Sequence, residues 1–205
     1  MRAFSPKEIS KKKYEVIPWG EKWSIPFGKP AVNELWFISG ASASGKSSFV
    51  MQLAKELCNY GDVLYLSYEE GISKSFQDRI KLFRMYEVQG RFRVVINDTY
   101  EEVVKRLQKH KSAHFVILDS LQVAGWSYDQ MVELKKRFKS KSFIVISQER
   151  KSQPMGAAAV SLRYLAGIKI RVVGFKAFCA GRFTSDAGSY YTVWEEGVVR
   201  TSNQL

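Results

Sequence analysis

Apolar and polar residues follow two different periods along most of this 205-residue chain. Short unbroken apolar runs are typical of strands buried on both faces of a parallel sheet. Segments whose apolar residues recur every three or four positions are typical of helices packed on one side. The apolar runs predict strands at 34–39, 62–68, 93–96, 114–118 and 142–147. The other pattern predicts helices at about 46–60, 72–83, 99–107, 127–139 and 157–165.

The order of these segments predicts the fold class. Strands that alternate with helices indicate an α/β domain with a mostly parallel central sheet flanked by helices. Three more apolar runs, at 168–173, 175–179 and 190–194, are close together and predict C-terminal antiparallel strands. Residues 149–156 are polar and lack periodicity, so we expect a loop there.

The first thirty residues differ from the rest. Prolines and glycines interrupt regular structure between Pro18 and Pro30, and the stretch Lys11–Lys13 is basic. Trp19 and Trp23 are nevertheless too apolar for a free tail, and we expect them to pack on this domain or on a neighbouring copy. The chain therefore divides into an N-terminal arm over residues 1–30 and one domain over 31–205.

A glycine-rich segment follows the first predicted strand and opens the first long helix. Its residues are Gly40, Ala41, Ser42, Ala43, Ser44, Gly45, Lys46 and Ser47. This is the G-x-x-x-x-G-K-[ST] pattern of a phosphate-binding loop in its expected strand–turn–helix context. Backbone N–H groups and the helix N-terminus would surround a polyphosphate, Lys46 would reach its β- and γ-phosphates, and the Ser47 hydroxyl would bind Mg²⁺. The alternative is a glycine- and serine-rich loop that matches by chance.

Polar side chains close three of the predicted strands, at the sheet edge where ligands of such folds bind. Asp119 is suited to hold Mg²⁺ through a bound water, although it could also cap a turn. Glu69 is the best candidate to orient or deprotonate an attacking water, with Glu70 second; the alternative is a solvated acidic turn. Gln148 suits a sensor of the γ-phosphate, or else it caps a loop.

Charge is distributed unevenly along the chain. The formal net charge is +12; residues 1–102 carry 15 Lys/Arg against 13 Asp/Glu, and residues 103–205 carry 17 against 7. This asymmetry indicates a polyanionic partner for the second half, or else a basic surface that aids solubility. The two cysteines, Cys58 and Cys179, form no metal-binding pair, and no apolar run reaches 18 residues. We expect a cytoplasmic protein without a membrane partner.

Taken together, four segments resemble the RecA-like ATPases, and most of all the RadA recombination ATPase and the DnaB-type replicative helicase. They are Gly40–Ser47, Leu64–Glu70, Val116–Gln122 and Ile146–Gln148. The resemblance covers about residues 30–200 and implies a RecA-like ATPase domain over 31–205 that uses ATP and Mg²⁺. It implies that Glu69 is the catalytic glutamate and that Gln148 reports the ATP state to the segment after it. In that segment Arg150 and Lys151 would contact DNA phosphates.

One part of the family pattern is incomplete. Proteins of this kind carry Lys-x-Arg near the C-terminal hairpins, where the pair acts on the γ-phosphate of the neighbouring subunit. The matching stretch here is Ala180-Gly181-Arg182, so such a role would depend on Arg182, with Lys176 a possible substitute. Arginines supplied in trans can raise the rate of phosphoryl transfer strongly. We therefore expect a homo-oligomer, either a ring or a filament.

Three functions fit these features. The leading hypothesis is an oligomeric ATPase that acts on DNA in recombination, repair or replication and binds single strands mainly through phosphate contacts. Trp126 and Tyr128 are the aromatic residues best placed to stack on bases, unless they pack in the core. The second hypothesis is a KaiC-like regulatory ATP switch whose partners are proteins. The third is a small-molecule kinase, which the order of Glu69, Asp119 and Gln148 disfavours.

Overall fold

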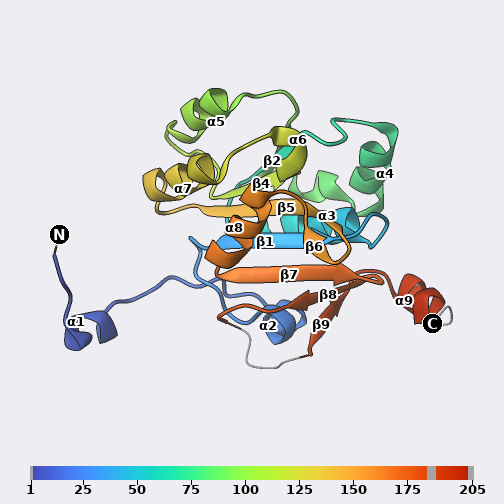
Figure 1. Cartoon of the computed structure of the whole chain (residues 1–205). Coiled ribbons are helices and arrows are strands. Elements are labelled where there is room, and N and C mark those ends of the chain that lie inside the picture. Colours follow the sequence, from blue (N-terminus) through green and yellow to red (C-terminus); the bar gives the residue numbers. More distant parts are fainter. Residues whose placement is uncertain (1, 184–187, 203–205) are drawn as a thin grey trace.

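The computed structural model describes residues 2–183 and 188–202, and a single mixed sheet runs through its centre (Figure 1). The strand order is β3-β2-β4-β5-β1-β7-β8-β9, with β6 paired to β5 off this path. Strands β1 to β5 and β7 are parallel, and β8 and β9 add antiparallel strands at one side. The bounds are β1 Leu35–Gly40, β2 Val63–Ser67, β3 Phe92–Val95, β4 Phe115–Asp119, β5 Ser142–Arg150, β6 Gln153–Pro154, β7 Ile168–Val173, β8 Lys176–Cys179 and β9 Tyr190–Thr192. The predicted fold class is confirmed.

Helices cover both faces of this sheet, because successive strand residues point to opposite sides. In β1, for example, Leu35 and Phe37 belong to one core and Trp36 and Ile38 to the other. Helices α5 (Tyr100–Leu107), α7 (Tyr128–Arg137) and α8 (Ala157–Leu165) pack on the first face. The second face carries α2 (Glu21–Phe27), α3 (Lys46–Leu57), α4 (Lys74–Leu82) and the 3-10 turn Met85–Val88.

Several helices begin at side-chain caps that the sequence contains. Thr99 and Ser127 each open a capping box, with the side chain at the third helical position returning a hydrogen bond to the cap backbone. Ser73 caps α4 through the Phe76 amide. Such caps satisfy backbone N–H groups that a helix leaves without partners at its start.

The N-terminal segment contains two helices that the sequence pattern did not predict. Helix α1 (Pro6–Ser10) is a short capped turn, and it lies away from the body of the molecule (Figure 1). Helix α2 belongs to the body. With neighbouring strands and α3 it forms an aromatic cluster, which we define as Trp19, Trp23, Phe27, Trp36, Phe49 and Tyr191. Trp19 and Trp23 thus pack on their own domain, and the division at residue 30 stays a prediction.

The aromatic cluster joins distant parts of the chain. The rings of Trp23 and Tyr191 stack with centroids 4.4 Å apart, so α2 is held against β9. Trp19 meets Trp36 of β1 edge-on at 5.8 Å, and its indole N–H donates to the Gly28 carbonyl at 2.7 Å. Phe49 brings α3, the helix after the glycine-rich segment, into the same cluster.

The segment expected to be a loop at 149–156 is in part a hairpin, so that expectation was wrong. Strand β5 continues to Arg150 and turns back into β6, pairing Arg150 with Gln153. Lys151 and Ser152 both have positive φ, 50° and 62°, as a two-residue hairpin turn requires. The usual Asn-Gly signal is absent, which is why the sequence did not indicate the turn.

Two more helices also lacked a sequence signal. Helix α6 (Leu121–Ala124) is only four residues long, too short for a helical period to show. Helix α9 (Glu195–Ser202) follows the last strand, and Figure 1 shows it beside the end of the β7–β8 hairpin. None of the helices in the described ranges is long and apolar enough to cross a membrane.

Candidate nucleotide site

The glycine-rich segment has the geometry of a phosphate-binding loop. It leaves the end of β1 and enters α3, with Gly45 capping the helix at φ 93°. That left-handed conformation favours glycine. At Gly40 a Cβ atom would lie 2.6 Å from the Val172 carbonyl oxygen, so only glycine fits this close approach to β7. Because these two glycines carry no side chain, the loop can turn its backbone N–H groups toward a ligand.

A phosphate chain fits the polar groups of this loop. The first turn of the twelve-residue helix α3 begins at Lys46 and carries no side-chain cap, so its N–H groups and positive dipole end face the loop. The Ser44 hydroxyl is buried and has no hydrogen-bond partner among the described residues. Anions bind at such helix N-termini. The loop thus meets the physical requirements of the triphosphate that its sequence predicts.

Asp119 lies at the end of β4, in register with Ser67 of β2. The hydroxyl of Tyr65 donates a short hydrogen bond to its Oδ2 atom. Burial raises the pKa of the Asp119 carboxyl, while the Tyr65 hydrogen bond and the charges of Lys46 and Arg79 act in the opposite direction. A cation placed at this carboxylate would therefore have a fixed, buried oxygen ligand.

The donor set at this edge suits Mg²⁺ held partly by phosphate. Within residues 2–183 and 188–202, no three His, Cys, Asp or Glu side chains gather into a metal site. Mg²⁺ commonly takes only one or two protein oxygens and completes its octahedron with waters and substrate phosphates. The Ser47 hydroxyl at the start of α3 and the Asp119 carboxylate can supply these two oxygens.

Glu69 and Gln148 are brought together across the sheet. Nε2 of Gln148 donates to Oε1 of Glu69 at 2.8 Å, although 79 positions separate the two residues. The Glu69 amide also donates to the Asp119 carbonyl at 3.1 Å, which holds the glutamate beside the end of β4. The three polar strand ends expected from the sequence therefore form one constellation next to the phosphate-binding loop.

Glu70 has different partners from Glu69. Its carboxylate forms an ion pair with Arg79 of α4 and accepts hydrogen bonds from the hydroxyls of Ser73 and Ser75. These groups belong to α4 and its cap. The local geometry thus assigns Glu70 to helix packing and leaves Glu69 at the open edge of the sheet.

Arg150 and Lys151 are exposed on the β5–β6 hairpin, which begins two residues after Gln148. Gln122 connects this hairpin to the sheet edge. Its Oε1 accepts from the Gln148 amide at 3.1 Å, and its Nε2 donates to the Met155 carbonyl at 2.7 Å. The Gln122 side chain is thus hydrogen-bonded both to the Gln148 backbone and to the far side of the hairpin.

Comparison with known proteins gives a clear result for the fold only. No protein-family model and no curated protein sequence matches the chain. Among solved structures, the flagellar accessory protein FlaH from Methanocaldococcus jannaschii matches with a TM-score of 0.61 and 17% identity, covering 88% of this chain and 92% of that one. The KaiC-like protein PH0186 from Pyrococcus horikoshii OT3 matches with a TM-score of 0.58 and 14% identity, covering 81% and 86%. The chain has the RecA-like P-loop fold. The closer resemblance to the RadA and DnaB types stays a prediction.

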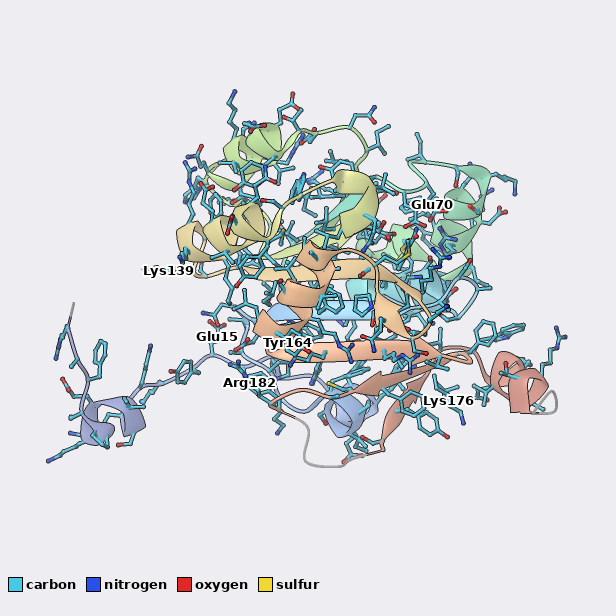
Figure 2. All side chains as sticks on the ribbon, in the orientation of Figure 1. Glu15, Glu70, Lys139, Tyr164, Lys176 and Arg182 are labelled. Carbon is cyan, nitrogen blue, oxygen red and sulfur yellow. The ribbon has the colours of Figure 1, made fainter. Side chains whose placement is uncertain are left out.

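Within this RecA-like domain, Arg182 and Lys176 lie at opposite ends of strand β8 (Figure 2). The Arg182 amide donates to the Gly167 carbonyl, just before β7 begins, so this arginine is at the sheet edge opposite the phosphate-binding loop. Lys176 is at the loop's edge, but its Nζ lies 4.5 Å from the ring centroid of Tyr190. Neither is placed by an observed contact at the phosphate-binding loop of its own chain.

The RecA-like domain also contains a polar network that sequence reasoning missed. The Glu149 side chain is only 2% exposed. It accepts a hydrogen bond from the Ser39 hydroxyl at 2.7 Å and forms an ion pair with Arg171 at 3.1 Å. Glu149 thus links β5 to β1 and to β7. Its partner in β1, Ser39, directly precedes Gly40 of the phosphate-binding loop. An acidic residue directly after Gln148, with an arginine in a neighbouring strand, was the available signal.

Trp126 does not have the position that base stacking requires. Its ring is 6% exposed and packs edge-on against Tyr100 at 5.3 Å and Tyr68 at 6.1 Å. Tyr128 is also partly buried against this cluster. Of the two interpretations of Trp126, the structure therefore supports packing in the core.

Proposed function

We propose that the chain is a Mg²⁺-dependent ATPase that hydrolyses ATP to ADP and phosphate in a homo-oligomer and acts on single-stranded DNA. The observation that carries the proposal is the 2.8 Å hydrogen bond between Gln148 and Glu69 beside the phosphate-binding loop. It joins the residue suited to activate water with the residue that leads into the basic hairpin.

The chemistry follows from the positions of the side chains. Lys46 and the N–H groups of the loop would bind the β- and γ-phosphates and offset their charge. Ser47 and Asp119 would hold Mg²⁺, which supplies further neutralisation of the phosphate oxygens. Glu69 would accept a proton from the attacking water as the new P–O bond forms and the bond to the ADP oxygen breaks.

The same contacts suggest how hydrolysis changes the hairpin. Bound ATP and an attacking water would give Glu69 and Gln148 new hydrogen-bond partners, so we expect ATP to favour a different arrangement of this pair. Because the Gln148 amide donates to Gln122, which also holds Met155, a shift at Gln148 is transmitted to both ends of the hairpin. The exposed Arg150 and Lys151 would respond to the nucleotide state.

An oligomer completes the site. Arg182 lies at the edge of the sheet opposite the phosphate-binding loop of its own chain. If it acts on a γ-phosphate, that phosphate belongs to a second copy, as in other phosphoryl-transfer enzymes whose arginine comes in trans.

The DNA function is tested by the salt dependence of binding. For the wild type, the affinity for a single-stranded oligonucleotide should fall steeply with salt, because binding of phosphates releases counterions. Replacing Arg150 and Lys151 by alanine should lower the slope of log K against log salt by about 1.4, the value expected for two phosphate contacts on a single strand. ATPase rates with and without the oligonucleotide give the second readout.

A matched control is available at the other edge of the sheet. Lys136 and Lys139 are exposed, and Lys139 lies far from the hairpin (Figure 2). Their double alanine variant removes the same charge and should leave the salt slope unchanged. Equal salt slopes of DNA binding for the two double variants, or no DNA binding by the wild type, would contradict the proposed DNA function.

A protein-directed ATP switch is the second candidate, and the likeness to the KaiC-like protein and to FlaH favours it. In this case DNA changes neither binding nor turnover. Backbone hydrogen exchange at 149–155 still differs between the ATP and ADP states, because the Gln148–Glu69 pair responds to the γ-phosphate. Phosphate transferred to a small acceptor rather than to water would instead indicate a kinase.

A further inference from the structure

One aromatic ring near the phosphate-binding loop is exposed. Trp194 has 42% of its surface accessible, whereas Trp19, Trp23, Trp36 and Trp126 are at most 6% exposed. It follows β9 and precedes α9, and its ring meets that of Phe175 edge-on with centroids 5.0 Å apart. The Arg200 guanidinium lies over the indole, 5.5 Å from its centroid.

Trp194 is fixed to the loop and to α3 by a series of contacts. The Phe175 amide donates to the Ser44 carbonyl at 3.1 Å, and the Phe175 ring would lie 2.7 Å from a Cβ at Gly45. The Val193 amide in turn donates to the Phe175 carbonyl at 2.8 Å. Nε2 of Gln52, in the second turn of α3, donates to the Val193 carbonyl at 3.1 Å. The indole therefore has a defined place beside the loop.

Packing beneath the ring also holds it in position. Gly197 is buried under the indole, and a Cβ there would lie 2.7 Å from the Phe175 ring and closer still to Trp194. Glycine thus allows α9 to approach both rings. An exposed tryptophan that is held in this way is a preformed surface rather than a loose side chain.

The strand order gives the direction in which a nucleotide extends. Glu69 and Asp119, which would act at the γ-phosphate, follow β2 and β4 on one side of β1. Phe175 and Trp194 adjoin β7, β8 and β9 on the other side. A triphosphate whose γ end points to the carboxylates therefore directs its sugar and base toward Trp194.

We infer that Trp194 is the stacking platform for the purine base of the bound nucleotide. The inference rests on the proposed function, because it places the base of the same triphosphate. Bases stack on aromatic side chains and on guanidinium planes through their π-faces. The ring is wide, exposed and next to the loop, and these are the properties such a platform needs.

The test compares ATP with inorganic tripolyphosphate, which has the phosphate chain but no base. Isothermal titration with Mg²⁺ should show that Trp194→Ala weakens ATP binding about tenfold, in line with the contribution of one base–aromatic stack. Binding of tripolyphosphate should not change. Trp194→Tyr should keep ATP affinity within about threefold of the wild type, since it retains an aromatic face.

Two controls separate this effect from others. Val199→Ala alters an exposed side chain of α9 and should leave the affinities for ATP and tripolyphosphate unchanged. Lys46→Ala should weaken both ligands. In the wild type, ATP should quench tryptophan fluorescence and tripolyphosphate should not, because Trp194 is the exposed indole; this measurement requires no variant.

The outcomes distinguish the two proposals. If the wild type binds neither ligand, the proposed function fails. If it binds ATP but Trp194→Ala binds ATP equally well, only the base platform is wrong. Equal losses of ATP and tripolyphosphate in Trp194→Ala would also overturn the platform, because the residue would then act by supporting the loop. Absence of quenching by ATP in a wild type that binds it leads to the same conclusion.

Discussion

Single side chains decide which groups at the sheet edge are available for chemistry. Glu69 and Glu70 are neighbours in the sequence, yet one meets Gln148 and the other is held by Arg79 and two serine hydroxyls. The partners differ because the chain has left β2 at Ser67 and turns toward α4 through these two residues. Their substitution therefore separates catalysis from stability.

We expect Glu69→Gln to lower kcat about 100-fold or more while ATP binding is retained, because a positioned general base contributes about 10²–10⁴-fold. Glu70→Gln should leave turnover nearly unchanged and lower the free energy of unfolding by about 1–3 kcal/mol, the usual range for losing hydrogen bonds to a charged group. Steady-state kinetics and urea unfolding of both variants provide the measurements. The reverse pattern would make Glu70 the base.

Residue types and spacing were enough to predict which residues line the candidate nucleotide site, but not which side chains they contact. Gly40–Ser47 and Asp119 are local patterns that follow apolar strands, so they can be read from the chain. Tyr65 and Glu149 were missed, because their partners come from other strands and depend on register. A buried tyrosine in an apolar strand does indicate that its hydroxyl has a partner, without saying which.

At the scale of elements, the β5–β6 hairpin is the least expected part of the structure. Its turn residues, Lys151 and Ser152, both adopt the left-handed region, which costs an L-residue about 1–2 kcal/mol. The pairing of Glu149 with Pro154 and the contact of Met155 with Gln122 hold this turn in place. Long-range contacts, rather than local preference, thus specify the element.

Replacing Lys151-Ser152 by Asn-Gly should stabilise the hairpin, because these residues favour the turn with two positive φ angles. We expect a gain of about 1 kcal/mol in the free energy of unfolding, measured with urea, and slower hydrogen exchange at Arg150 and Gln153. Ser140→Gly, at an exposed turn position outside the hairpin, serves as the control and should give no gain. A loss of stability in the Asn-Gly variant would mean that the turn has another form.

At the scale of the whole molecule, the two ends of the sheet carry different halves of the proposed catalytic site. The phosphate-binding loop is at one edge and Arg182 is at the other. Parallel strand order predicts this separation in principle. The position of Arg182 required the register of β8 on β7, which the short strand and its polar neighbours do not indicate.

Mixing two inactive variants tests whether the halves act across copies. Lys46→Ala lacks a functional loop and keeps Arg182, whereas Arg182→Ala has the reverse defect. Each alone should lose turnover, but a mixture should recover up to about a quarter of wild-type activity, because random pairing places an intact loop beside an intact arginine in that share of sites. Steady-state ATPase rates across mixing ratios measure this. Activity that stays at the level of the separate variants would contradict action in trans.

The aromatic cluster described above has a consequence for how the protein is made. Roughly 170 residues separate Trp23 from Tyr191, so at ribosomal rates of about 5–20 residues per second some 10–30 s pass between them. During this interval Trp23 and Phe27 lack their ring partner Tyr191 of β9, and we expect them to offer an apolar binding surface to a chaperone. Because Phe49 of α3 also contacts Tyr191, the helix behind the phosphate-binding loop gains its full support only after β9 has been made. We therefore expect a nascent chain to become competent to bind a nucleotide only after β9 has been made.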